Sequence, residues 1–271
     1  MQCDTHDTIS RAMPTELKSE RRARTLVLTI SDPATRNALS PQIYAAGVEA
    51  LATAEADADL GAVVFTGDGG HFSAGGNVQR LQQTRRIDAL AQADALKAFH
   101  DFVEAIRVCP KPVIAAVEGY AAGGGFALAL ACDLIVAASD ARFVMSYARI
   151  GLSPDGGGSW HLARALPRAL ALEALWLAEP LSAAQLHVHG VVNRVAPNGQ
   201  ALAEALLLAE RLAAMAPNAI GSVKELVEAA AARGLAEQLN SEAMHFVQNL
   251  VHENAGEGLQ AFFDKRAPRF R

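Results

Sequence analysis

The sequence predicts an α/β fold with a largely parallel sheet and a helical C-terminal region. Two patterns support this: apolar strand-like segments alternate with helical ones up to about residue 196, and only helical spacing remains beyond about residue 200. The composition agrees, because 51% hydrophobic and 20% charged residues in a chain of 271 allow a large buried core. We therefore expect a flexible lead-in over 1–22, an α/β core over 23–199 and a helical region over 200–271.

The predicted strands are short, apolar and bounded by turn residues. The first is rich in β-branched residues, and those that follow are mostly continuous apolar runs, as in parallel strands buried on both faces. Strands are therefore expected at residues 24–30, 61–67, 112–117, 134–137 and 142–145, with a short late strand at 190–195.

Two helices in the first half of the chain have clear sequence markers. Ser40 followed by Pro41 predicts a helix start, because a serine side chain caps free N–H groups and proline fits the first helical position. Residues 79–92 are polar and lack a period, so we expect a mobile segment there. The next helix is predicted where apolar residues recur at helical spacing, at Leu96, Phe99, Val103 and Ile106.

The charge and the cysteines argue against several classes of function. A formal net charge of −5 with no basic stripe argues against a nucleic-acid partner, and no apolar run is as long as a membrane span. Cys3, Cys109 and Cys132 are too widely spaced for a disulfide framework, and neither they nor the scattered histidines have metal-ligand spacing. From this spacing we expect no metal site. The polar first residues do not resemble a signal peptide, so we expect a cytoplasmic protein.

Two glycine-rich loops, residues 68–76 and 119–125, each follow a predicted strand and lead into a helix. Glycine lets the backbone approach a ligand closely, and the first turn of a helix offers unpaired N–H groups. Such loops suit a phosphate or a developing oxyanion, although neither carries the phosphate-binding pattern GxxxxGK(S/T) or a complete dinucleotide pattern. Glycines also permit tight turns, but two loops and a third glycine run at 156–158 favour a binding role.

Five separated motifs follow one another along the chain: RNAL at 36–39, FSAGGN at 72–77, EGYAAGGG at 118–125, IGLSPDGGG at 150–158 and EGLQAFFDKR at 257–266. Together they resemble the enoyl-CoA hydratase/isomerase (crotonase) family from about residue 24 onward. The resemblance implies a crotonase-like ββα superhelix with a C-terminal helical oligomerisation region. It also implies an acyl-CoA substrate and a homotrimer or homohexamer, with coenzyme A as part of the substrate and no separate cofactor.

The resemblance further implies which atoms hold the substrate. In this family the backbone N–H groups at the positions of Gly76 and Gly124 bind the thioester oxygen and stabilise an enolate. Losing one such donor costs about 10²–10³ in rate. Ala38, Ala74 and Gly75 correspond to residues that line the coenzyme site, mainly through their backbone.

A residue near the C-terminus is expected to complete the coenzyme site. Family members often use a lysine or an aromatic residue here, which corresponds to Lys265 or Phe263. Because members usually form trimers or pairs of trimers, this residue often reaches the site of a neighbouring subunit.

The acidic residues indicate an isomerase more than a hydratase. Hydration of an enoyl thioester needs a water held between two carboxyl groups, but Ala127 and Tyr147 stand where hydratases of the family carry glutamate. Asp155 is similar to the aspartate of isomerases in phenylacetate breakdown, which act on 1,2-epoxyphenylacetyl-CoA and shift the double bond of 3-enoyl thioesters. One carboxylate can take a proton from one carbon and return it to another while the oxyanion loops carry the charge.

Other interpretations of the same residues stay open. Asp155 could cap a helix instead, and Tyr147 could line the acyl pocket or orient the substrate. The chain could also be a hydratase with unidentified catalytic residues, an aryl-CoA dehalogenase supported by Tyr147 and His100, or a non-catalytic binder of CoA thioesters. Replacing Asp155 by asparagine separates catalysis from binding.

Overall fold

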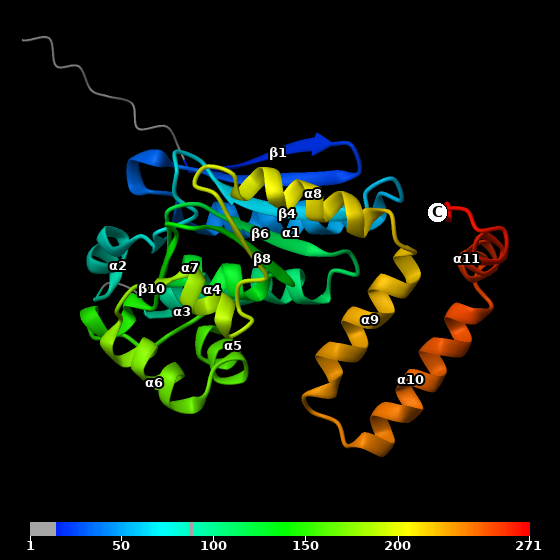
Figure 1. Cartoon of the computed structure of the whole chain (residues 1–271). Coiled ribbons are helices and arrows are strands. Elements are labelled where there is room, and N and C mark those ends of the chain that lie inside the picture. Colours follow the sequence, from blue (N-terminus) through cyan, green and yellow to red (C-terminus); the bar gives the residue numbers. More distant parts are fainter. Residues whose placement is uncertain (1–14, 87–88) are drawn as a thin grey trace, which may run out of the picture.

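A six-stranded sheet forms the centre of the α/β core in the computed structural model, which describes residues 15–86 and 89–271 (Figure 1). Its strands are β1 (Glu16–Arg22), β2 (Thr25–Ser31), β4 (Ala62–Gly67), β6 (Val113–Val117), β8 (Leu134–Ala138) and β11 (Arg194–Ala196). They lie in the order β1-β2-β4-β6-β8-β11, and all neighbours run parallel except β1 and β2. The α/β fold with a mainly parallel sheet is therefore confirmed.

Helices connect the strands and continue beyond the last of them. They are α1 (Pro41–Ala56), α2 (Val78–Thr84), α3 (Ala89–Val108), α4 (Gly124–Ala131), α5 (Gly158–Ala165), α6 (Arg168–Leu177), α7 (Ala183–Val188), α8 (Ala201–Ala213), α9 (Pro217–Ala230), α10 (Leu235–Leu250) and α11 (Glu253–Phe263), with 3₁₀ turns η1 (Pro33–Thr35) and η2 (Ser146–Ile150). The start of α1 is as predicted, because Ser40 Oγ accepts a hydrogen bond from the N–H of Ile43. Over residues 15–86 and 89–271, no helix is both long enough and apolar enough to cross a bilayer.

The two faces of the sheet are covered by different helices, because side chains alternate between the faces along each strand. In β4, Val63 and Phe65 join the large core formed with α1, α3 and α4, whereas Ala62 and Val64 join a smaller cluster with α8. Figure 1 shows α8 lying along the sheet, and small side chains such as Ala205 allow its close approach. Helix α8 therefore packs as part of the core, although the predicted helical region begins at residue 200.

Two small sheets join the loops that follow the central strands. One pairs β3 (Ala38–Leu39) in parallel with β5 (Gly75–Gly76). The other contains β7 (Tyr120–Ala122), β9 (Arg142–Val144) and β10 (Leu181–Ser182), with β9 in the middle. The first ladder ties the first glycine loop to the segment at residues 38–39, and the second ties the other glycine loop to β9. An isolated bridge between Ser73 and Ala121 joins the two loops directly.

Helices α9, α10 and α11 form an arm that extends away from the sheet (Figure 1). Lys224 of α9 anchors the arm by an ion pair with Asp133, whose Oδ2 lies 2.8 Å from Nζ. Many large apolar side chains of the arm are nevertheless exposed, which marks an interaction surface in proteins of this size. They include Val223, Val227, Leu235, Leu239, Met244, Phe246, Val247, Leu250, Val251, Leu259, Phe262 and Phe263.

Strand β1 corrects the prediction of a flexible lead-in over 1–22. Residues 16–22 form an edge strand that pairs with β2 along its whole length. The first part of the predicted lead-in, residues 1–14, lies outside the described residues. The strand is highly charged because an edge exposes its side chains and charges discourage pairing with other chains. Its charges are also paired, since Lys18 contacts Asp68 and Arg21 contacts Asp57.

Helix α2 corrects part of the prediction of a mobile segment over 79–92. The N-cap Asn77 accepts a hydrogen bond from the N–H of Arg80, and the helix continues to Thr84. None of its residues is buried, so it lacks the apolar period that would reveal a helix in the sequence. Helix α3 begins at Ala89, and residues 87–88 lie outside the described part. The late strand is also displaced, since β11 occupies Arg194–Ala196 rather than 190–195.

Candidate active site

The first glycine loop lies against the turn that carries the RNAL motif. The N–H of Ala74 donates to the carbonyl of Arg36 at 2.9 Å, and Ala38 pairs with Gly75 in the β3–β5 ladder. Gly75 has a φ of +81°, and a Cβ at this position would lie 2.4 Å from the carbonyl oxygen of Ala122. Only glycine fits here, because both the backbone conformation and the space exclude a side chain.

The second glycine loop places a helix N-terminus beside the first loop. Gly124 is the first residue of α4, so its N–H has no carbonyl partner within its own helix. A Cβ on Gly75 would lie 2.8 Å from the nitrogen of Gly124, which shows how closely the loops approach. The structure thus brings together the segments that contain Gly76 and Gly124. Their role as the two oxyanion donors stays a prediction.

Asp155 lies in the turn between η2 and α5 and is partly buried. The hydroxyl of Tyr147 donates a hydrogen bond to Asp155 Oδ1 at 2.5 Å. Helix α5 begins at Gly158, its N-cap Gly157 supplies no side-chain cap, and the carbonyl of Asp155 accepts from the N–H of Gly158. The carboxylate of Asp155 is therefore held by a tyrosine and does not act as the side-chain cap of α5.

The surroundings of Asp155 shift its titration and that of nearby tyrosines. Burial raises the pKa of Asp155 above its usual range, while the Tyr147 hydrogen bond and the nearby His100 oppose this increase. Burial and then the charge of Asp155 raise the pKa of Tyr44 to about 12. The same two causes raise the pKa of Tyr147 still further, so both phenols remain protonated donors at neutral pH.

The walls around Asp155 are aromatic and apolar. Phe99 packs against Tyr44 with ring centroids 5.0 Å apart, and a Cβ on Gly156 would lie 2.3 Å from the Phe99 ring. The methyl group of Ala127 lies beside the same glycine, 3.1 Å from that Cβ position. Ala127 and Tyr147, which replace the two expected glutamates, therefore do border the turn that carries Asp155.

The same ring of Phe99 lies between the turn of Asp155 and the second glycine loop. It lies 3.6 Å from a Cβ position on Gly124, and the ring of Tyr147 lies 3.8 Å from a Cβ position on Gly123. The turn of Asp155 and the start of α4 are therefore neighbours. An acyl group whose thioester oxygen lies at Gly124 would have its first carbons near the carboxylate.

Sequence reasoning missed two walls of this site. Tyr44 carries no motif, and its place follows only from the packing of α1 against α3. The sequence predicts Phe99 as part of a helical stripe, but its approach to Gly124 of the second glycine loop and to Gly156 is a tertiary feature. The sequence suggests a role for His100 only in a dehalogenase, yet it is exposed on α3 and acts electrostatically on Asp155.

The predicted C-terminal coenzyme contacts lie elsewhere. Phe263 ends α11 and is 74% exposed, and Lys265 follows in the next turn, also exposed. Figure 1 shows α11 at the opposite side of the molecule from α2 and α4. Within one chain the structure does not bring Phe263 or Lys265 to the site, so they remain predictions for the site of another copy.

Comparison with known proteins places the whole core and arm in one family. The family model for enoyl-CoA hydratase/isomerase matches residues 20–271. An enoyl-CoA hydratase of Mycobacterium tuberculosis is 33% identical over 252 residues, covering 93% of this chain and 95% of that protein. The 1,2-epoxyphenylacetyl-CoA isomerase of Escherichia coli is 34% identical over 252 residues, covering 90% of this chain and 94% of that protein.

A solved structure shows the same architecture. The crystal structure of an enoyl-CoA hydratase from Polaromonas sp. JS666 superposes with a TM-score of 0.93 at 56% sequence identity, covering 94% of this chain and 99% of that one. Its match extends the agreement from separate motifs to the backbone of 94% of this chain. The chain is therefore a member of the enoyl-CoA hydratase/isomerase family, an enzyme family that acts on CoA thioesters.

Proposed function

We propose that this protein is an acyl-CoA isomerase that uses Asp155 as its single acid and base. The observation that carries the proposal is the environment of that carboxylate: one oxygen is held by Tyr147, and the turn lies beside the start of α4. Because Tyr147 holds Oδ1, we assign the proton transfer to Oδ2. Burial raises the pKa of Asp155, which makes it a stronger base than an exposed aspartate.

The reaction balances with this one group. The carboxylate of Asp155 removes a proton from C2 of a 3-enoyl-CoA, and the electron pair moves into the thioester, whose oxygen accepts hydrogen bonds from Gly76 and Gly124. The protonated Asp155 then returns the proton to C4, and the double bond settles between C2 and C3. No electrons leave the substrate, so the reaction needs no redox group and no cofactor beyond the coenzyme A of the substrate.

A ring substrate is a second possibility within the isomerase proposal. The relative from Escherichia coli carries the name 1,2-epoxyphenylacetyl-CoA isomerase, and it matches this chain almost end to end. Aromatic walls formed by Tyr44 and Phe99 suit a flat ring in the acyl position. The proposed site is thus compatible with either a linear 3-enoyl group or the epoxide of a phenylacetyl group.

Hydration is the alternative function, favoured by the relatives. The Polaromonas structure, at 56% identity, is named an enoyl-CoA hydratase, and so are most of the relatives with high similarity. In this chain a water would have to be activated by Asp155 with Tyr147 as its partner in place of two glutamates. A phenol with a strongly raised pKa is a poor proton donor in that role.

Ultraviolet absorbance with purified protein separates these functions. We expect 3-enoyl-CoA to gain the absorbance of a conjugated thioester, and 2-enoyl-CoA to keep it. Rapid loss of conjugation from 2-enoyl-CoA would establish the hydratase instead. No change with either substrate, while CoA thioesters still bind, would point to the epoxide substrate or to a non-catalytic binder.

We also propose that the arm joins copies of the chain into a homotrimer or homohexamer. The exposed apolar side chains of α9, α10 and α11 support this, because a lone chain would leave them in water. Assembly would also give Phe263 and Lys265 a site to complete, since their own chain's site lies on the opposite side. A cytoplasmic location stays a prediction, in keeping with Cys109 and Cys132, which are free thiols.

A further inference from the structure

We propose that Asn37 is a positioning residue for the oxyanion hole, acting through the backbone of the first glycine loop. The inference rests on the proposed function, because it assigns a role in orienting the N–H of Gly76. It is carried by a buried hydrogen-bond network that is separate from the reacting carboxylate. The network joins Asn37 to both ends of the loop that precedes Gly76.

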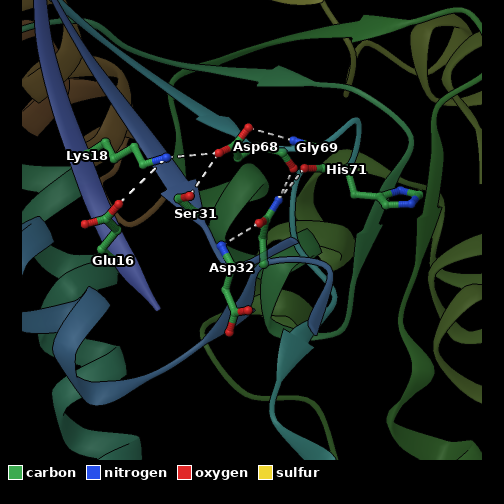
Figure 2. Close-up of polar contacts among 8 residues, drawn as sticks. Glu16, Lys18, Ser31, Asp32, Asp68, Gly69 and His71 are labelled. Carbon is green, nitrogen blue, oxygen red and sulfur yellow. Dashed lines mark hydrogen bonds and ion pairs between the residues drawn. The ribbon is translucent and has the colours of Figure 1, made fainter. Parts of the chain in front are cut away.

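Asn37 is fully buried and has a left-handed backbone with a φ of +60°. Asparagine tolerates this conformation better than most residues. Its side chain makes three hydrogen bonds: Oδ1 accepts from the N–H of Asp32 at 2.9 Å, and Nδ2 donates to the carbonyls of Asp68 and His71, each at 2.7 Å. Figure 2 shows these partners converging from the end of β2 and from the glycine loop.

The main chain of Asn37 extends the network toward the predicted donor. Its carbonyl accepts a hydrogen bond from Ser73 Oγ at 2.7 Å, and Ser73 Oγ accepts one from the N–H of Gly75 at 3.1 Å. Ser73 is fully buried, so solvent cannot replace these bonds. The peptide that links Ala74 to Gly75, immediately before the peptide that carries the N–H of Gly76, is therefore held by Asn37 through one serine.

Gly76 needs such support because packing does not orient it. It is exposed, and a Cβ at this position would meet nothing within 4 Å. Its direction is set by the β3–β5 ladder, where it pairs with Leu39, and by the residues before it. Asn37 precedes β3 and holds the residues before β5, so it acts on both strands of the ladder.

An outer layer of polar contacts supports the same loop. Asp68 Oδ2 accepts hydrogen bonds from Lys18 Nζ at 3.1 Å and Ser31 Oγ at 2.9 Å, and Oδ1 accepts from the N–H of Gly69 (Figure 2). These bonds lower the pKa of Asp68, so it stays ionised. They are partly exposed, however, whereas the amide of Asn37 is buried and its loss cannot be compensated by water.

Three substitutions test the role: two change the amide of Asn37 itself, and one changes the serine that links it to Gly75. Asn37→Asp keeps the shape but replaces the donor by a carboxylate that faces two carbonyl oxygens. Asn37→Gly keeps the left-handed backbone and removes the side-chain bonds. Ser73→Ala leaves the amide intact and removes only the link to Gly75, and it serves if Asn37→Asp fails to fold. Asn193→Asp is the matched control, because Asn193 holds β8 through its Oδ1, which the change preserves.

The readout is the enolate fraction of a bound 3-oxoacyl-CoA, seen by ultraviolet absorbance, together with kcat and KM. This fraction reports stabilisation of a thioester oxyanion without needing turnover. We expect Asn37→Asp, Asn37→Gly and Ser73→Ala to lower the enolate fraction and to reduce kcat about tenfold to a hundredfold, with a smaller change in KM. Asn193→Asp should keep the wild-type enolate fraction, and thermal unfolding identifies any variant whose loss follows from instability.

The outcomes separate this inference from the proposed function. A wild-type enolate fraction in a folded Asn37→Asp or Ser73→Ala variant would overturn the positioning role while leaving the oxyanion hole in place. An equal loss in Asn193→Asp would also overturn it, since the effect would then be general. If the wild-type protein binds the 3-oxoacyl-CoA but forms no enolate, both the oxyanion hole and the positioning role are wrong.

Discussion

Asp155 combines partial burial with one strong hydrogen bond, and the two effects act in opposite directions on its pKa. Burial raises the pKa, and the Tyr147 hydroxyl lowers it by favouring the carboxylate. The net effect is an increase, so the carboxylate is a better base than that of an exposed aspartate. A single residue can thus serve in both directions of proton transfer.

Asp155→Asn should lose turnover by several orders of magnitude without losing stability. Because folding raises the pKa of Asp155, its stabilising contribution is present below the ordinary carboxyl pKa and is lost as the pH rises through the folded value. Asparagine removes the buried charge, and its amide oxygen still accepts from Tyr147. Thermal unfolding at pH 7 should therefore show an unchanged or higher Tm. A large decrease in Tm would mean that the charge is part of a stabilising network.

Tyr147→Phe should move the acid limb of the kcat/KM profile to higher pH. The limb reports the protonation of Asp155, and loss of the Tyr147 donor removes an effect that lowers this pKa. A hydrogen bond to a charged group corresponds to about one pH unit. Tyr44→Phe removes a neighbouring phenolic hydroxyl without this bond and should move the limb less. If the acid limb moves equally in both variants, the hydrogen bond from Tyr147 does not set the pKa of Asp155.

At the scale of elements, the close approach of β5 to the start of α4 leaves no room for an added side chain at Gly75. Gly75→Ala should separate them, since its Cβ would collide with the carbonyl of Ala122. Gly70→Ala is a matched control: Gly70 has the same φ of +81°, but its Cβ would meet nothing within 4 Å. We expect kcat to fall more than tenfold only for Gly75→Ala. Equal kcat losses in both variants would mean that backbone strain, rather than the approach of the loops, matters.

The sequence predicts the elements that are buried along their whole length or that carry clear capping residues. Strands buried on both faces appear as apolar runs, and α1 carries a capping serine and a proline, so these were found. The edge strand β1 and the exposed helix α2 bury little, so polarity hid them. The site followed the same division: Asp155 and the glycine loops lie in motifs, whereas Tyr44 and the network of Asn37 depend on contacts between distant segments.

At the scale of the whole molecule, the arm leaves many large apolar side chains exposed to solvent within one chain. Phe246 and Val251 on and after α10 are 68% and 80% exposed, and Phe262 on α11 is 78% exposed. Burying such side chains contributes about 1.5–3 kcal/mol each. In the proposed assembly, a second copy covers this face and completes the coenzyme site.

Sedimentation velocity should therefore show an assembly larger than one chain. Phe246→Asp should shift the protein toward monomers, because a charge in an apolar interface loses its hydration. Val188→Asp on α7 adds the same charge at a residue that is 81% exposed outside the arm, and it should leave the assembly intact. A monomeric wild-type protein at micromolar concentration would contradict the proposed role of the arm.

The most direct test of the central claim follows one hydrogen atom. A 3-enoyl-CoA labelled with deuterium at C2 is converted by the enzyme, and mass spectrometry of the product locates the label. If Asp155 carries the proton from C2 to C4, part of the deuterium appears at C4, and Asp155→Asn gives no product. Conversion with complete loss of the label to water, or unchanged conversion by Asp155→Asn, would contradict a single-carboxylate isomerase.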